Sequence, residues 1–189
     1  FVANPPDRCY FCKRRRFLAL RQMAERRGFA WVADGTNLSD SGAYRPGMRA
    51  LAEIGVRSPL QEAGLTKPEV RELSRLLDLP TWNRPSAPCL ATRIPYGTEI
   101  TREALERIGR AERLLHALEF PVVRVRAHFD TARIEVPPEE LSRLLALRPI
   151  VVRGLEECGF GYVTVDLQGY RSGSLDEALA RRGKEVANA

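Results

Sequence analysis

The chain has 189 residues, a length that suits one large domain or one and a half small ones. Its hydrophobic share of 44% is ordinary for a globular protein, and no apolar run approaches the roughly 20 residues of a membrane-spanning helix. The formal net charge of +6 suits a phosphate-bearing ligand, or only a solvated surface, because the basic residues are scattered rather than blocked.

The first third of the chain predicts part of an α/β sheet domain. Apolar residues at helical spacing predict a helix over 13–27, ended by Gly28. The apolar run 29–33 and the turn cluster 34–37 predict a buried parallel strand that ends in a loop. Ligands bind just past such strand ends in open α/β sheets.

The next elements are shorter. A helix is expected at 49–54 and a strand near 56–60. Thr66 and Glu69 form a capping-box pattern that predicts the start of a helix, which ends before Pro80. The apolar face of this helix carries Val70, Leu73, Leu76 and Leu77.

Residues 80–100 are expected to be irregular, because four prolines forbid regular structure through most of the segment. A long irregular segment inside a compact protein is usually functional or disordered. This one contains Trp82, Cys89 and Tyr96, so we expect an ordered, functional loop.

From Thr101 the pattern predicts a separate α+β unit. Thr101 caps a helix whose apolar face continues to Leu118, and a hairpin with a turn at 128–131 follows it. The remaining elements are two helices and a strand, expected at 138–147, 149–158 and 162–166. The tail 181–189 is expected to be frayed.

Three of the four cysteines form the main chemical pattern. Cys9 and Cys12 make a Cys-x-x-Cys just before the first predicted helix, and Cys89 lies in the proline-rich loop. Without a secretory signal this pattern indicates a metal site or redox chemistry. Spacing alone leaves zinc and an iron–sulfur cluster equally open. Cys158 could be a fourth zinc ligand, but its place on a predicted helix face favours simple packing.

Several segments, in order along the chain, resemble the signature motifs of the LarE family of PP-loop ATP pyrophosphatases. They are Asn4–Lys13 (NPPDRCYFCK), Asp34–Asn37 (DGTN), Tyr44–Gly47 (YRPG), Trp82–Thr98 (WNRPSAPCLATRIPYGT) and Tyr170–Gly173 (YRSG). The combination covers nearly the whole chain and is specific, whereas no single segment would be.

The resemblance implies an ATP-dependent sulfur transferase that acts on pyridinium-3,5-biscarboxylic acid mononucleotide, a precursor of the nickel-pincer cofactor. In such enzymes ATP (with Mg²⁺) adenylylates a carboxylate, sulfur displaces AMP, and a thiocarboxylate results. Some members sacrifice a cysteine sulfur. Others share the pattern of Cys9, Cys12 and Cys89 and hold a 4Fe-4S cluster, which we therefore favour over zinc. A cytoplasmic homo-oligomer is expected, with no membrane or nucleic acid as partner.

The resemblance also implies roles for further side chains. Arg124 and Arg126, two residues apart on one strand face, are expected to hold the substrate phosphate. Glu112 is a candidate metal ligand or arginine partner. The remaining candidates are Thr92, Arg93 and Arg171 for the substrate, and Gly35, Thr36, Asn37 and Asp40 for the nucleotide-site loop.

One family motif is missing. A PP-loop enzyme needs a Ser-Gly-Gly-x-Asp-Ser loop to bind the ATP phosphates, and the chain contains no Gly-Gly pair. With Phe1 in place of Met, we expect the chain to be a fragment that is inactive alone. Residues 1–98 are expected to form the C-terminal part of a PP-loop (HUP-like, adenine nucleotide alpha hydrolase-like) parallel-sheet domain. Residues 99–180 are expected to form a small α+β domain for substrate binding or oligomerisation, followed by the tail.

Two other functions fit some of these features. An iron–sulfur tRNA thiolase of the same superfamily would use the basic charge, although the chain has only one Cys-x-x-Cys and no zinc-knuckle pairs. A non-catalytic module would hold structural zinc through all four cysteines.

Overall fold

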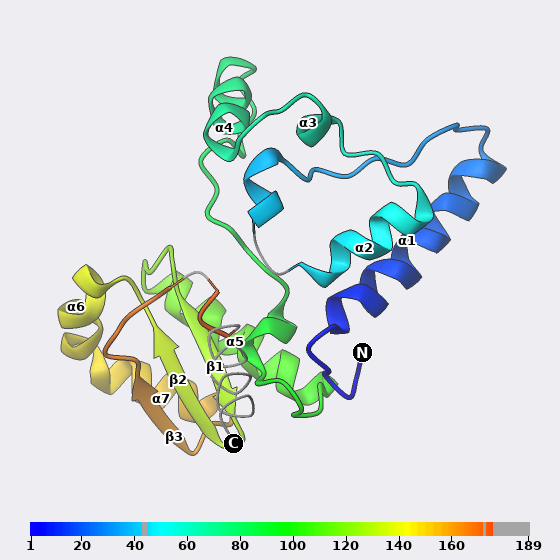
Figure 1. The fold of residues 1–189 in the computed structure, drawn as a ribbon. Coiled ribbons are helices and arrows are strands. Elements are labelled where there is room, and N and C mark those ends of the chain that lie inside the picture. Colours follow the sequence, from blue (N-terminus) through cyan, green and yellow to red (C-terminus); the bar gives the residue numbers. More distant parts are fainter. Residues whose placement is uncertain (43–44, 172, 176–189) are drawn as a thin grey trace, which may run out of the picture. The chain divides into compact units, whose positions relative to one another are not determined.

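The computed structural model describes residues 1–42, 45–171 and 173–175 (Figure 1). They form two compact units, one made of Phe1 and Pro5–Arg84 (unit 1), the other of Val2–Asn4 and the chain from Pro85 onward (unit 2). The division falls at Arg84/Pro85 rather than at the expected 98/99, so the loop that contains Cys89 belongs to unit 2. The expected frayed tail lies outside the described residues. Within the described part, no helix has the length and apolar character needed to cross a bilayer.

Unit 1 is mainly helical. Its longest helix, α1, packs along α2 (Figure 1). Helix α1 begins at Arg8 rather than near residue 13, because the Arg8 N–H bonds the Pro5 carbonyl and the turn starts directly after the two prolines. Cys9 and Cys12 therefore lie inside the helix and not before it. The elements are α1 Arg8–Arg26, η1 Leu38–Gly42, α2 Pro46–Ile54, α3 Pro59–Glu62 and α4 Lys67–Leu76.

The two strands expected in unit 1 are reduced to one parallel bridge between Ala33 and Arg57. Backbone hydrogen bonds of 2.9 Å flank this bridge, but the apolar run before it is not buried, since Trp31 is 62% exposed. A buried parallel strand needs neighbours on both edges and helices on both faces. The described residues of unit 1 supply one short partner, and residues 59–62 turn into α3 instead.

Helix α4 begins as predicted. The Thr66 N–H donates to the Glu69 carboxylate at 2.8 Å, which satisfies one of the N–H groups that a helix start leaves unpaired. Its apolar face is not covered within the described residues: Leu76 is 64% exposed.

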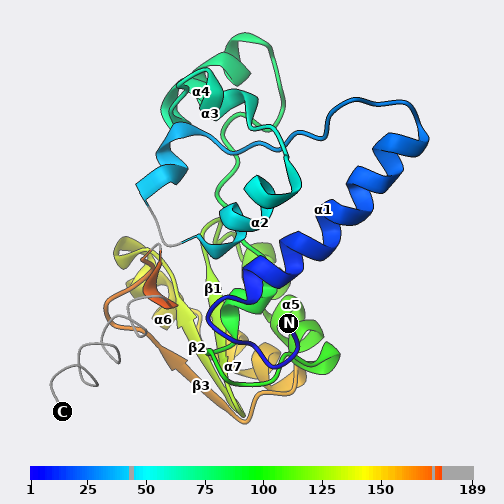
Figure 2. The same cartoon turned by 45° about the vertical axis from the view of Figure 1, so that its right-hand side comes forward.

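Unit 2 is an α+β structure around a three-stranded sheet in the order β1-β2-β3 (Figures 1 and 2). Strands β1 and β2 form the predicted antiparallel hairpin, and β3 lies parallel to β2. The predicted helix starting after Thr101 is confirmed, with the Thr101 hydroxyl oxygen accepting the Ala104 N–H. The elements are η2 Leu90–Arg93, α5 Arg102–Ala117, β1 Arg124–His128, β2 Thr131–Glu135, η3 Pro138–Glu140, α6 Leu141–Ala146, α7 Arg148–Glu157 and β3 Tyr162–Val165.

The sheet has one apolar and one polar face, because successive side chains of a strand point to opposite sides. Val125 and Ile134 lie on the apolar face and pack against α5 and α7, through buried residues that include Leu115 and Leu155. Cys158 is buried in the same core, as its packing interpretation predicts. The opposite face carries arginines and Glu135 and meets the segment that contains Cys89.

Candidate functional site

The Cys89 loop, defined here as residues 85–93, ends in the short 3-10 turn η2. The Cys89 side chain is exposed. Its carbonyl oxygen accepts two hydrogen bonds from Thr92, one from the backbone N–H at 2.9 Å and one from the hydroxyl at 2.8 Å. The backbone on the C-terminal side of Cys89 is therefore closed into a defined turn, while its thiol faces solvent.

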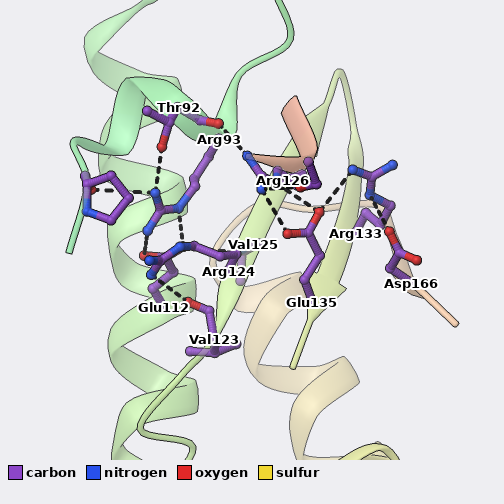
Figure 3. A network of polar contacts seen from close by, with 12 residues as sticks. Thr92, Arg93, Glu112, Val123, Arg124, Val125, Arg126, Arg133, Glu135 and Asp166 are labelled. Carbon is purple, nitrogen blue, oxygen red and sulfur yellow. Dashed lines mark hydrogen bonds and ion pairs between the residues drawn. The ribbon is translucent and has the colours of Figure 1, made fainter. Parts of the chain in front are cut away.

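Arg93 and Glu112 form a buried ion pair beneath this turn (Figure 3). Two N–H groups of Arg93 donate to the two carboxylate oxygens at 2.6 and 3.0 Å, and a third donates to the Thr92 hydroxyl at 2.6 Å. Glu112 also accepts the backbone N–H of Val125 at 3.0 Å, which ties α5 to β1. Of the two expected roles of Glu112, the structure contains that of an arginine partner.

Arg126 and Glu135 form a second buried pair on the polar face of the sheet (Figure 3). Both oxygens of Glu135 accept from Arg126 at 2.9 Å. The remaining donors of Arg126 bond the Thr92 carbonyl at 2.6 Å and the Ser174 hydroxyl at 2.8 Å. Arg133 donates to the same carboxylate at 3.0 Å.

Glu135 was not among the site residues that the sequence indicated. The available signal was positional: the strand alternation puts Glu135 and Arg133 on one face of β2, and the hairpin register brings both opposite the arginines of β1. An acidic residue in such a place is the natural partner of guanidinium groups that would otherwise be buried without compensation.

Arg124 completes the set. It lies on the same face as Arg126, as the two-residue spacing predicts, and it is buried. Its guanidinium donates to the Ser86 carbonyl at 2.7 Å and lies over the Tyr170 ring at 5.2 Å from the centroid. Burial lowers the pKa of Arg124, and the positive charge of Arg93 lowers it further.

These contacts bear on the expected phosphate site. Four N–H donors of Arg126 already bond protein groups. Arg124 uses fewer of its donors, on the carbonyls of Val123 and Ser86. Arg171, expected in the same pocket, is half-buried in unit 2. The predicted substrate residues Thr92, Arg93, Arg124 and Arg126 do lie together, but many of their donors bond the Cys89 loop or the carboxylates of Glu112 and Glu135.

The candidate residues of unit 1 form a separate group. Cys9 and Cys12 lie three residues apart in the first turns of α1 and therefore point to one side of the helix. Cys9 is exposed and Cys12 is half-buried. Within each unit, no three described His, Cys, Asp or Glu side chains are gathered as metal ligands. The third thiol of the expected set, Cys89, belongs to unit 2.

The expected nucleotide-site loop is held by its own side chains. Asp34 accepts from the Thr36 hydroxyl at 2.6 Å and from the Ser58 hydroxyl at 2.7 Å. Burial works to raise the pKa of Asp34, but these hydrogen bonds and the Lys13 ammonium group outweigh it and lower the pKa.

Asp40 has an equivalent role at the other end of this loop. It accepts the Asn37 N–H at 3.1 Å and faces Arg45 at 2.9 Å. Thr36 and Asn37 are both buried, whereas Gly35 is exposed. The expected nucleotide-site loop is thus an ordered turn that follows the bridge between Ala33 and Arg57.

Comparison with known proteins gives three curated relatives, whereas no family model matches. An uncharacterised protein of Synechocystis sp. is 46% identical over 96% of this chain and 68% of its own length. The pyridinium-3,5-bisthiocarboxylic acid mononucleotide synthase of Lactiplantibacillus plantarum is 41% identical over 94% of this chain and 64% of its own. An uncharacterised protein of Methanocaldococcus jannaschii is 32% identical over 90% and 67%.

The chain thus spans about two thirds of the length of the relatives it matches, and in each case the match covers at least 90% of the chain itself. The chain therefore belongs to the family of these proteins, the LarE family whose motifs its sequence resembles.

Proposed function

We propose that this chain carries the sulfur-transferring part of an enzyme that converts carboxylates of a pyridinium mononucleotide into thiocarboxylates. The observation that carries the proposal is the 41% identity, over 94% of the chain, to a pyridinium-3,5-bisthiocarboxylic acid mononucleotide synthase. The exposed Cys89 thiol, in a loop fixed from below by buried ion pairs, supports it.

The proposed reaction has two steps. A carboxylate oxygen of the substrate attacks the α-phosphorus of ATP, so that pyrophosphate leaves and an acyl adenylate forms. A sulfur nucleophile then attacks the acyl carbon, the bond from carbon to the AMP oxygen breaks, and AMP leaves with that oxygen. The new carbon–sulfur bond completes the thiocarboxylate. The first step activates a poor electrophile, because AMP is a far better leaving group than oxide.

Cys9, Cys12 and Cys89 are proposed as the ligands of a 4Fe-4S cluster. The donor set fits, because thiolates are the ligands that such clusters require. When bound, the cluster would supply a site for an added sulfide, with inorganic sulfide as its source. The role of the chain in this step is to hold Cys89 in a fixed position next to the polar face of the sheet.

The arginines of unit 2 are proposed to favour an anionic substrate. Arg93, Arg124 and Arg126 bring three positive charges to the polar face, against the two carboxylates of Glu112 and Glu135. The surplus positive charge, in a partly desolvated place, attracts phosphate and carboxylate groups. Arg124 is the proposed phosphate contact, since more of its donors remain for a ligand than those of Arg126.

The test is a single-turnover assay on the whole protein that carries this chain, with ATP, pyridinium-3,5-biscarboxylic acid mononucleotide and sulfide, read by mass spectrometry. Cys89→Ser should abolish thiocarboxylate formation, whereas Cys158→Ala should retain it, because Cys158 packs in the core. Unchanged product formation by Cys89→Ser would refute the assignment of Cys89.

A further inference from the structure

We infer that Glu135 and Arg126 act as a positioning pair for Cys89, with Glu135 fixing the guanidinium that anchors the loop at Thr92. The importance of this positioning for sulfur transfer rests on the proposed function. The anchoring itself does not, and it is tested separately below.

Arg126 connects the pair to the Cys89 loop. Arg126 donates to the Thr92 carbonyl at 2.6 Å, while its other side is held by both oxygens of Glu135. A guanidinium is planar and rigid, so fixing one edge bidentately fixes the direction of its remaining N–H bonds. Glu135 therefore determines where the Thr92 carbonyl is held, although it touches no loop atom in the described contacts.

Thr92 connects Arg126 to Cys89. The Thr92 N–H and hydroxyl both donate to the Cys89 carbonyl, at 2.9 and 2.8 Å. Thr92 is thus bonded to Arg126 through its carbonyl and to Cys89 through its two donors. A displacement of the Thr92 backbone would therefore also displace the Cys89 carbonyl group that is bonded to it.

Both residues of the pair are buried. Glu135 is fully buried and Arg126 is 6% exposed, so water does not readily replace either partner. In an exposed ion pair, water would compete for both charged groups, and the pair would contribute little to the position of the loop. Burial makes the pair a rigid support, comparable to Arg93 and Glu112, which reach the same turn through the Thr92 hydroxyl.

Arg133 provides a matched control. It donates to the Glu135 oxygen that Arg126 Nε also bonds, at 3.0 Å, and pairs with Asp166 at 3.7 Å, but none of its contacts among the described residues is with the Cys89 loop (Figure 3). Replacing Arg133 removes one cationic partner of Glu135 and leaves the anchor intact. Replacing Arg126 removes a cationic partner and the anchor together.

The experiment is amide hydrogen exchange on the ligand-free chain, read on peptides that cover residues 85–94. Glu135→Gln leaves at most one oxygen for Arg126, and Arg126→Lys keeps the charge but lacks the fork. Both should speed exchange at the Thr92 amide by about tenfold, the loss expected for one net hydrogen bond. Arg133→Gln should leave this exchange unchanged. In Glu135→Gln and Arg126→Lys the acceleration at Thr92 should exceed any acceleration in α5, whose exchange reports the overall stability of unit 2.

Each outcome decides the inference. Equal exchange at Thr92 in the parent chain, Glu135→Gln and Arg126→Lys would overturn it, and so would an equal acceleration by Arg133→Gln. If Glu135→Gln fails to fold, Arg126→Lys decides alone. In the whole protein, Glu135→Gln should lower kcat for thiocarboxylate formation and leave the KM for ATP unchanged. If no sulfur transfer occurs in the parent protein, the proposed function fails while the exchange result still stands.

Discussion

Glu135 and Arg126 are diagonal neighbours across β1 and β2, joined by two hydrogen bonds of 2.9 Å, and the Glu135 side chain has no solvent exposure. Such a pair is costly to break from one side, because the remaining charge stays buried without a partner. Removing one partner alone therefore measures the cost of the unpaired charge, and replacing both partners by apolar residues shows how much of that cost is recovered.

We expect Glu135→Leu to destabilise unit 2 by about 3–5 kcal/mol, since it leaves Arg126 buried and uncompensated. The double variant Glu135→Leu with Arg126→Met should recover part of this loss. Denaturant unfolding should be followed by far-UV circular dichroism, because Trp31 and Trp82 both lie in unit 1 and report on that unit. A loss below about 1 kcal/mol for the single variant would show that the pair is not buried as described.

Cys158 gives a second prediction about the core. Its side chain is 8% exposed and packs with the apolar residues between the sheet and the helices. Cys158→Ala should cost about 1 kcal/mol, and Cys158→Ser should cost more, because a hydroxyl replaces a thiol in an apolar site. Neither should change bound iron or zinc. A fall in metal content in both variants would favour the four-cysteine zinc module instead.

Much of unit 2 could be predicted from the sequence, because its signals are local. The Thr101 cap, the hairpin around residues 128–131 and the two short helices after it each depend on residues within a few positions of one another. Unit 1 was harder. The run 29–33 is apolar enough for a buried strand, but burial depends on neighbouring strands, and the described residues give it one bridge partner.

In the candidate site, too, local features could be predicted from the sequence and distant contacts could not. Alternation correctly put Arg124 and Arg126 on one strand face. Their partners could not be found that way, since the Ser86 carbonyl lies 38 positions from Arg124 and the Thr92 carbonyl 34 positions from Arg126. Backbone acceptors carry no residue identity, so no sequence pattern marks them. The sequence therefore indicated guanidinium groups that would bind an anion. In the structure, backbone carbonyls and the Glu135 carboxylate accept hydrogen bonds from these groups.

His128 gives a pH-dependent prediction. Burial lowers its pKa, and Arg133 and Arg126 lower it further, against the opposite effect of Glu135. Because the folded chain disfavours the protonated ring, stability should be complete above the ordinary pKa of 6.5 and decline as the pH falls below it. His128→Gln should remove this part of the decline. Unfolding free energies at about pH 7.5 and about pH 5.5 test it, and an equal decline in both proteins would contradict it.

Metal analysis after anaerobic purification tests the proposed cluster. We expect about four iron atoms and matching labile sulfide per chain, lost in Cys12→Ala and retained in Cys158→Ala, since Cys12 is a proposed ligand and Cys158 is a core residue. About one zinc atom per chain, with little iron, would instead support a structural thiolate site.

The last prediction concerns ATP. No Gly-Gly pair, and hence no Ser-Gly-Gly-x-Asp-Ser loop, occurs in the 189 residues, and backbone N–H groups of such a loop are what cradles the ATP phosphates. We therefore expect the 189 residues alone to release no AMP from ATP in the presence of the pyridinium substrate, as measured with labelled ATP. The whole protein should release both pyrophosphate and AMP. Cys89→Ser in that protein should still release pyrophosphate but form little AMP, because adenylylation releases pyrophosphate and AMP leaves only in the later step assigned to the thiol. Robust AMP formation by the 189 residues would show that a phosphate site exists among them, and the ordered turn at residues 34–40, with its buried Thr36 and Asn37, would be the place to look for it.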